Sequence, residues 1–135
     1  MSGERRPGPR AAGRGFTLVE MLVVLAIVSL LVALAVPRYV DRVEDAREAV
    51  LRENLKVVRT AIDRFQADAG RYPRDLAELV ERRYLAALPH DPITDRNDSW
   101  VEVGADRIEP GASGIGDVRS GAEGESRGGR PYAEF

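Results

Sequence analysis

The sequence contains no cysteine and only one histidine, His90, among its 135 residues. The absence of cysteine excludes disulfide scaffolds, thiol catalysis and zinc sites with cysteine ligands. Aromatic residues make up 6% of the chain, which is thin for a surface that stacks on bases. The 20 basic residues are outnumbered by 22 acidic ones, and a net charge of −2 disfavours a basic nucleic-acid binder. We therefore expect neither an enzyme nor a nucleic-acid partner.

The first 15 residues form a basic, irregular segment. Four Arg and one Glu give it a charge of +3, and much of the remainder is Gly and Pro. Gly and Pro at this density disfavour both helix and strand. A basic segment ahead of an apolar run is typical of targeting sequences, and its Arg excess is expected to stay on the cytoplasmic side of a membrane. We interpret residues 1–15 as a leader and place the C-terminal part of the chain on the opposite side.

Residues 16–36 are apolar except for Thr17, Glu20 and Ser29. A helix of this length spans roughly 31 Å, close to the hydrocarbon thickness of a bilayer, so we predict a transmembrane helix. Glu20 is the exception, because an unpaired carboxylate inside such a helix costs about 3 kcal/mol. A position at the membrane interface would reduce this cost.

Two ordinary interpretations of the apolar run remain open. Residues 33–35 read Ala-Leu-Ala, which resembles the cleavage site of a secretory signal peptide. Cleavage after Ala35 would release a soluble secreted protein. Alternatively, the run is a simple uncleaved anchor. Neither interpretation gives Glu20 a role.

The hexapeptide GFTLVE at residues 15–20, between a basic leader and an apolar stretch, resembles the class III signal of type IV pilin-like proteins. Pro37 lies 21 residues beyond Phe16 and also matches the spacing of that family. The resemblance implies that prepilin peptidase cuts after Gly15 and that the new N-terminal Phe16 is methylated. It further implies that Glu20 pairs with the Phe16 amine of a neighbouring subunit, which would offset the burial of both charges.

Residues 37–70 are predicted to form an amphipathic continuation of this helix, which Gly70 ends. Apolar residues recur there in steps of three and four, at Leu51, Leu55, Val58, Ile62, Phe65 and Ala69. Pro37 cannot donate a hydrogen bond to the Ala33 carbonyl, so we expect a kink or local loosening at that point.

Residues 71–135 are predicted to form a small head. We expect a short helix near residues 75–83 and strands at 100–103 and 115–119, within two to four antiparallel strands joined by long Gly-rich loops. The fold class is therefore α+β. A long N-terminal helix, with a transmembrane half and an amphipathic half, packs on a small antiparallel β head.

A second resemblance lies in the head. Tyr72-Pro73 and the segments 88–92, 114–124 and 131–132 resemble the head of the G-type major pseudopilin of type II secretion. That resemblance implies a filament subunit of a short periplasmic pseudopilus that drives protein export. It implies an inner-membrane location with a periplasmic head. The implied partners are copies of the chain itself, minor pseudopilins, an inner-membrane assembly platform, prepilin peptidase and, before assembly, membrane lipid. A type IV pilus subunit for motility, adhesion or DNA uptake stays open, although the lack of cysteine favours the pseudopilin.

The same resemblance implies a calcium ion in the C-terminal loop. Carried over by position, the candidate ligands are Asp117, Ser120, Glu123, Glu125 and Ser126. Calcium takes six to eight oxygen ligands on a flexible loop, which this stretch could supply. The acidic cluster expected shortly before the C-terminus is absent, however. Solvated acids in a Gly-rich loop are therefore an equal alternative.

Overall fold

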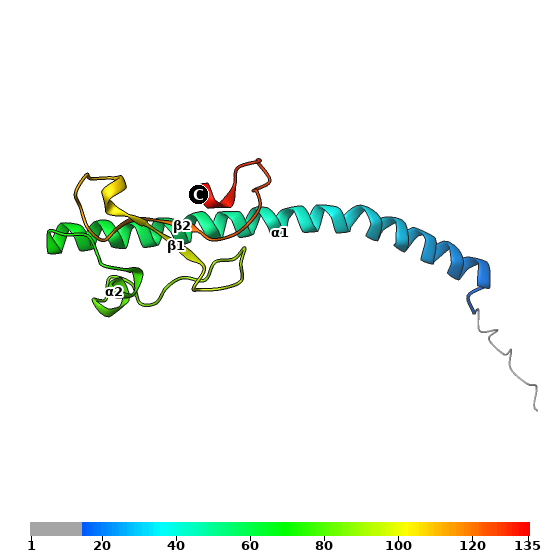
Figure 1. Cartoon of the computed structure of the whole chain (residues 1–135). Coiled ribbons are helices and arrows are strands. Elements are labelled where there is room, and N and C mark those ends of the chain that lie inside the picture. Colours follow the sequence, from blue (N-terminus) through cyan, green and yellow to red (C-terminus); the bar gives the residue numbers. More distant parts are fainter. Residues whose placement is uncertain (1–14) are drawn as a thin grey trace, which may run out of the picture. The chain divides into compact units, whose positions relative to one another are not determined.

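The computed structural model describes residues 15–135, so the predicted leader lies outside the described residues except for Gly15. The elements run in the order α1 (Leu18–Ala69), α2 (Leu76–Glu81), β1 (Trp100–Gly104), 3-10 helix η1 (Ala105–Arg107), β2 (Ile115–Ser120) and 3-10 helix η2 (Tyr132–Glu134) (Figure 1). The chain divides into two compact units, one up to Tyr39 and one from Val40 to Phe135. The α+β class is confirmed. The division falls three residues later than the predicted boundary at residues 36 and 37.

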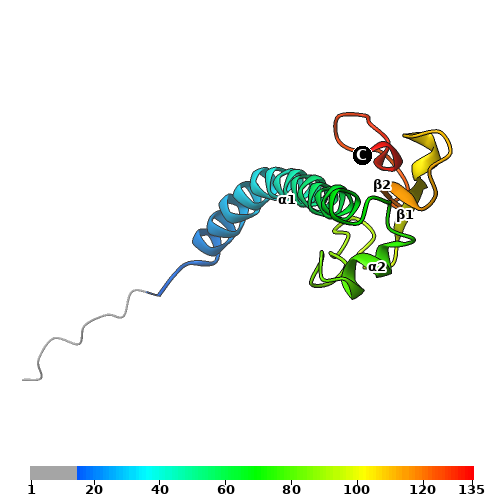
Figure 2. The same ribbon diagram turned by 90° about the vertical axis from the view of Figure 1, so that its left-hand side faces the viewer.

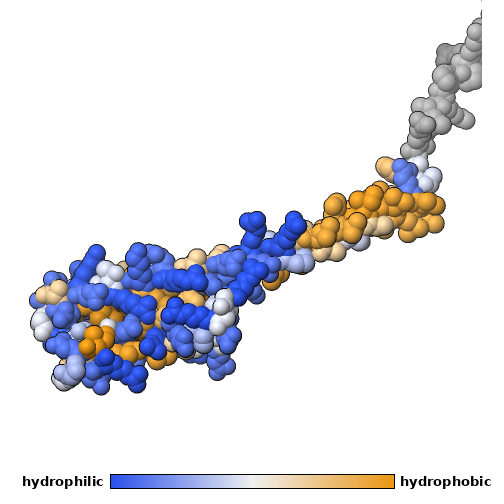
Figure 3. Space-filling model, turned by 90° about the horizontal axis from the view of Figure 1, so that it is seen from above, coloured by the Kyte–Doolittle hydropathy of each residue, from blue (hydrophilic) through white to orange (hydrophobic). Residues whose placement is uncertain are grey.

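The N-terminal part of α1 has the length and composition of a membrane-spanning helix. Its side chains are exposed on all sides from Leu18 to Val36. Figure 3 shows these apolar side chains gathered over this part of the helix. Pro37 lies inside α1, and the helix continues through it without a break. The loosening expected at Pro37 is therefore not seen as an interruption of the helix.

The C-terminal part of α1 supplies one wall of the head's core. The predicted apolar stripe is buried at Leu51, Leu55, Val58, Ile62 and Phe65, whereas Ala69 is exposed. These side chains pack in one cluster with residues of α2, β1 and β2. Figures 1 and 2 both place α2 and the two strands beside this part of α1.

Gly70 ends α1 as predicted. Its φ is +67°, a left-handed conformation that glycine adopts without the steric penalty of a side chain. Its N–H donates to the Gln66 carbonyl at 2.9 Å, which satisfies one of the last helical carbonyls.

The short helix α2 begins one residue later and ends two residues earlier than the predicted helix near residues 75–83. Asp75 accepts a hydrogen bond from the Glu78 N–H at 2.8 Å, as an N-cap residue does. The buried Glu78 carboxylate accepts from the Arg71 guanidinium at 2.6 Å and from the Arg74 N–H at 2.7 Å. These bonds lower the pKa of Glu78 to about 2, with the Arg71 hydrogen bond as the largest cause. Glu78 thus ties the end of α1 to the start of α2.

The head's sheet has two antiparallel strands, the lower limit of the predicted range. In its register Trp100 faces Ser120 and Glu102 faces Val118, and the register shifts between Val103 and Gly104. Trp100 is buried in the core, and its indole N–H donates to the Pro89 carbonyl at 2.9 Å. Its role is packing, as expected for a lone tryptophan.

Candidate functional site

The predicted cleavage point lies just ahead of the first turn of α1. Gly15, Phe16 and Thr17 have no helical or strand assignment, and the Phe16 side chain is 76% exposed. The Gly15–Phe16 peptide bond is therefore outside the hydrogen-bonded helix. A peptidase would not have to unwind a turn of α1 to reach it.

Thr17 caps α1. Its hydroxyl oxygen accepts a hydrogen bond from the Glu20 N–H at 3.1 Å, and its carbonyl accepts from the Met21 N–H at 3.1 Å. Thr followed three residues later by Glu is the pattern of a capping box, so this cap could have been predicted from the sequence. It explains why α1 begins at Leu18, two residues after the predicted start at Phe16.

Glu20 lies in the first turn of α1, four residues from Phe16. Its carboxylate favours the positive end of the helix dipole. No Lys or Arg among residues 15–135 forms an ion pair with it. The described part of the chain therefore leaves this carboxylate available to a cation of another molecule.

Gly15 likewise has no role within the described fold. No atom lies within 4 Å of the position a Cβ would take, and its φ is outside the left-handed region. A side chain at residue 15 would meet no obstacle within this part of the chain. A requirement for glycine would have to come from a second molecule.

The structure gives two of the five candidate calcium ligands partners within the head. The Asp117 carboxylate accepts from Arg59 Nε at 2.7 Å and from the Val118 N–H at 2.7 Å. The Ser120 hydroxyl is buried and donates to Asp91 Oδ2 at 2.7 Å.

The other three candidates lie in the loop after β2. Glu123 and Glu125 are exposed, and the Ser126 hydroxyl accepts from the Arg130 N–H at 3.2 Å. Within residues 15–135, no group of three or more His, Asp or Glu side chains is placed to hold a metal ion. The five candidates as arranged do not fit a calcium site, and calcium binding remains a prediction.

His90 lies on the surface of the head and is about half exposed. Its Nε2 lies 2.8 Å from Asp95 Oδ1, and its Nδ1 lies 3.3 Å from the Asn97 side-chain oxygen. The hydrogen bond with Asp95 is the largest cause of its raised pKa. The imidazole therefore holds together the turn between residues 90 and 97, and its two nitrogens face no nucleophile.

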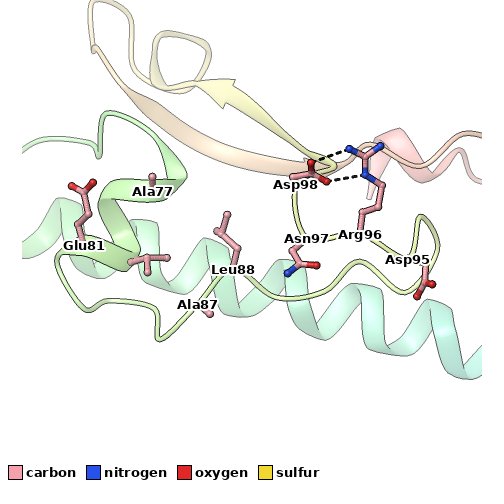
Figure 4. A pocket seen from close by; sticks show the side chains of 9 residues that line it. Ala77, Glu81, Ala87, Leu88, Asp95, Arg96, Asn97 and Asp98 are labelled. Atoms are coloured by element: carbon pink, nitrogen blue, oxygen red, sulfur yellow. Dashed lines mark hydrogen bonds and ion pairs between the residues drawn. The ribbon is translucent and has the colours of Figure 1, made fainter.

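An open groove of about 770 Å³ lies between α2 and the loop of residues 87–98 (Figure 4). Its apolar lining includes Ala77, Val80 and Leu88. On its charged side, Arg96 Nε pairs with Asp98 Oδ1 at 2.8 Å, as the dashed lines in Figure 4 show. Arg96 and Asp98 therefore offset each other's charge at the edge of the groove.

Two arginines that hold the head together have no signal in the sequence. Arg59 on α1 donates to Asp117, to the Val118 carbonyl and to the backbone oxygen of Phe135. Arg127 in the C-terminal loop pairs with acids of α1. These partners are far apart along the chain, so periodicity and spacing could not identify them.

Comparison with known families supports the N-terminal signal. The family model described as "Prokaryotic N-terminal methylation motif" matches residues 10–36. This match includes the GFTLVE hexapeptide and the whole of the apolar run.

Relatives extend the similarity into the head. The chain is 31% identical to the type II secretion system core protein G of Pseudomonas aeruginosa over 131 residues, covering 84% of this chain and 87% of that protein. It is 34% identical to the competence protein ComGC of Halalkalibacterium halodurans, covering 53% of this chain and 70% of that protein. It is 36% identical to the type IV major pilin protein PilA of Myxococcus xanthus, covering 44% of this chain but only 27% of that protein. No solved structure matches significantly.

Proposed function

This chain belongs to the type IV pilin-like family, together with the type II secretion system core protein G, and we propose that it is a major pseudopilin. In this role it is a structural subunit of a short periplasmic filament that drives protein export. Its partners are other copies of itself, minor pseudopilins and an inner-membrane assembly platform. Prepilin peptidase processes it first.

The placement of Glu20 is the observation that carries this proposal. An exposed apolar helix presents one carboxylate in its first turn, and no ion-pair partner lies among the described residues. A carboxylate in an apolar environment needs a cation to offset its desolvation. Cleavage after Gly15 creates such a cation, the Phe16 ammonium, one turn away on every copy of the chain. Methylation leaves that amine able to carry its charge.

Because the acid of one subunit pairs with the amine of the next, the two charges give the filament a direction of assembly. In a filament, Glu20 of one subunit accepts the Phe16 ammonium of its neighbour, and the apolar faces of adjacent helices cover each other. Before assembly, membrane lipid covers the same side chains. The subunit therefore leaves the bilayer without exposing its apolar helix to water, since each copy replaces lipid with another copy.

The charge distribution sets the topology. The leader carries +3 and the remainder of the chain −5. Arginines beside a transmembrane helix are retained on the cytoplasmic side. The chain thus crosses the inner membrane once, and its head lies in the periplasm.

A pilus subunit is the second candidate, because ComGC and PilA are also similar to this chain. The extent of the matches favours the pseudopilin. The match to core protein G covers 84% of the chain, head included, whereas the match to PilA covers 44%.

Replacement of Glu20 tests the proposal. In a host that carries the secretion apparatus, Glu20→Ala should abolish the filaments seen by electron microscopy. Glu20→Gln should fail in the same way, because it keeps the shape of the side chain but loses the charge. Both variants should still reach the membrane and begin at methylated Phe16, which separates failed assembly from failed processing.

Glu53→Ala is the matched control, since Glu53 is an exposed acid farther along α1. It should form filaments at the normal yield. Normal filaments from Glu20→Ala would overturn the pairing. If the wild-type chain forms filaments but its deletion leaves the export of folded cargo unaffected, the pilus would be favoured instead.

A further inference from the structure

The chain after β2 forms a long irregular loop. Its backbone is closed on itself by the Ser126 N–H to the Arg130 carbonyl at 2.8 Å, by the Tyr132 N–H to the Gly124 carbonyl at 3.1 Å, and by three shorter-range bonds at Gly129 and within η2. Within residues 15–135, no backbone–backbone hydrogen bond joins this loop to α1, so side chains make that connection. The resemblance to the G-type pseudopilins implies that a calcium ion holds this loop. The residues present, as arranged, do not fit a calcium site.

Arg127 attaches the middle of this loop to α1. Its Nη2 lies 3.1 Å from Asp41 Oδ2, and its Nη1 lies 3.2 Å from Asp45 Oδ2. Its backbone N–H donates to Glu48 Oε1 at 2.8 Å. The three acids lie on successive turns of one helix, so a single arginine spans two turns of α1. The charges of Asp41 and Asp45 are the largest causes of the raised pKa of Arg127.

Phe135 attaches the end of the loop. It is 6% exposed, and the guanidinium groups of Arg52 and Arg130 lie 5.1 Å and 5.0 Å from its ring centre. Its backbone oxygen accepts from Arg59 Nη2 at 2.9 Å. The end of the loop is therefore held by an aromatic ring in the core and by arginine rather than by acidic ligands.

We propose that Arg127 closes the C-terminal loop onto α1 and takes the structural role that a calcium ion has in the G-type pseudopilins. A guanidinium between carboxylates neutralises the same negative charge as a cation would, with donors fixed in a planar fork. The loop closes without a metal ion, so its closure is insensitive to chelators. It is sensitive to salt, because the paired side chains are about half exposed.

The test uses the processed full-length chain in detergent and has two readouts. The first is the Tm in EDTA and in millimolar calcium chloride. The second is the rate at which a Glu-specific protease cuts after Glu123 and Glu125, which reports opening of the loop itself. The wild-type Tm and cleavage rate should be the same in EDTA and in calcium.

Arg127→Gln should lower the Tm by about 4 °C and speed cleavage after Glu123 and Glu125 in both solutions. The gap in Tm from wild type should narrow at high salt. The Tm and the cleavage rate of Arg127→Lys should lie between those of wild type and Arg127→Gln, because lysine keeps the charge but lacks the planar fork of donors. Arg107→Gln is the control, since Arg107 is exposed and forms no ion pair within residues 15–135, and it should behave as wild type.

Two results would overturn the proposal. Calcium that raises the wild-type Tm and slows cleavage of the loop would show that a metal holds it. Arg127→Gln with wild-type Tm and cleavage would show that the ion pairs do not hold it. Where Arg127→Gln does not fold, Asp45→Asn removes one partner from the surface of α1 and should speed cleavage of the loop in the same way. Neither outcome depends on whether the chain forms pseudopili or pili.

Discussion

The two units of this chain share the helix α1 but differ in whether its apolar side chains are exposed or buried. Up to Tyr39, α1 leaves its apolar side chains exposed, and its one carboxylate, Glu20, has no partner within the described residues. From Val40 onward, α1 buries a full apolar stripe, and the buried Glu78 and Asp91 have hydrogen-bond partners. The head's residues can thus be explained by the head itself. Those of the N-terminal segment have no such explanation within the described residues, and the proposed filament would supply one.

The same substitution in the two units should have very different effects on the stability of the head. Leu55 is 1% exposed, so Leu55→Ala should destabilise the head by about 3 kcal/mol through lost burial and a residual cavity. Leu25 is 60% exposed, so Leu25→Ala should leave unfolding of the head unchanged. It should reduce the yield of filaments instead, because in the proposed filament its side chain packs against other subunits. Denaturation of the detergent-solubilised full chain and filament recovery measure the two effects.

Low pH should destabilise the head by protonating Glu78. Because its hydrogen bonds lower its pKa from 4.5 to about 2, the ionised carboxylate stabilises the folded head above about pH 4.5. This contribution is lost as the pH falls from there towards 2. The Tm of wild type should therefore exceed that of Glu78→Gln at neutral pH, and the gap should shrink across this window. Glu81→Gln is the control at an exposed acid of the same helix, and a gap that does not change with pH would refute the assignment.

Replacement of a glycine should also have different effects on folding in the two units. Gly70→Ala places a side chain at a φ of +67° and should cost about 1 kcal/mol of head stability. Gly15→Ala meets no neighbouring atom and should cost nothing in folding. Equal losses of Tm in the two variants would show that Gly15 has a structural role in the chain.

Local patterns predicted most of the elements. The steps of three and four along α1 predicted which side chains are buried, and alternation predicted β1 and β2 to within a residue. Gly70 ends α1 through its own backbone conformation, so sequence was sufficient for it. Thr17 could have been identified in the same way from the capping pattern.

Long-range pairing could not be predicted. Arg59 meets Asp117, 58 positions away, and Arg127 meets Asp45, 82 positions away. A charged residue in a loop carries no local signal for such a partner. The strand register also depends on contacts beyond the strands themselves. The contacts of Arg59 with Asp117 and of Asp91 with Ser120, two of the candidate calcium ligands, could not be predicted for the same reason.

The most direct test of the account is the mass and N-terminal residue of the protein extracted from the membrane of a host with prepilin peptidase. We predict a chain that begins at methylated Phe16, with Glu20 in its first helical turn. A chain that begins at Val36 would instead be a secreted soluble protein, and it would contradict both the filament and the role of Glu20.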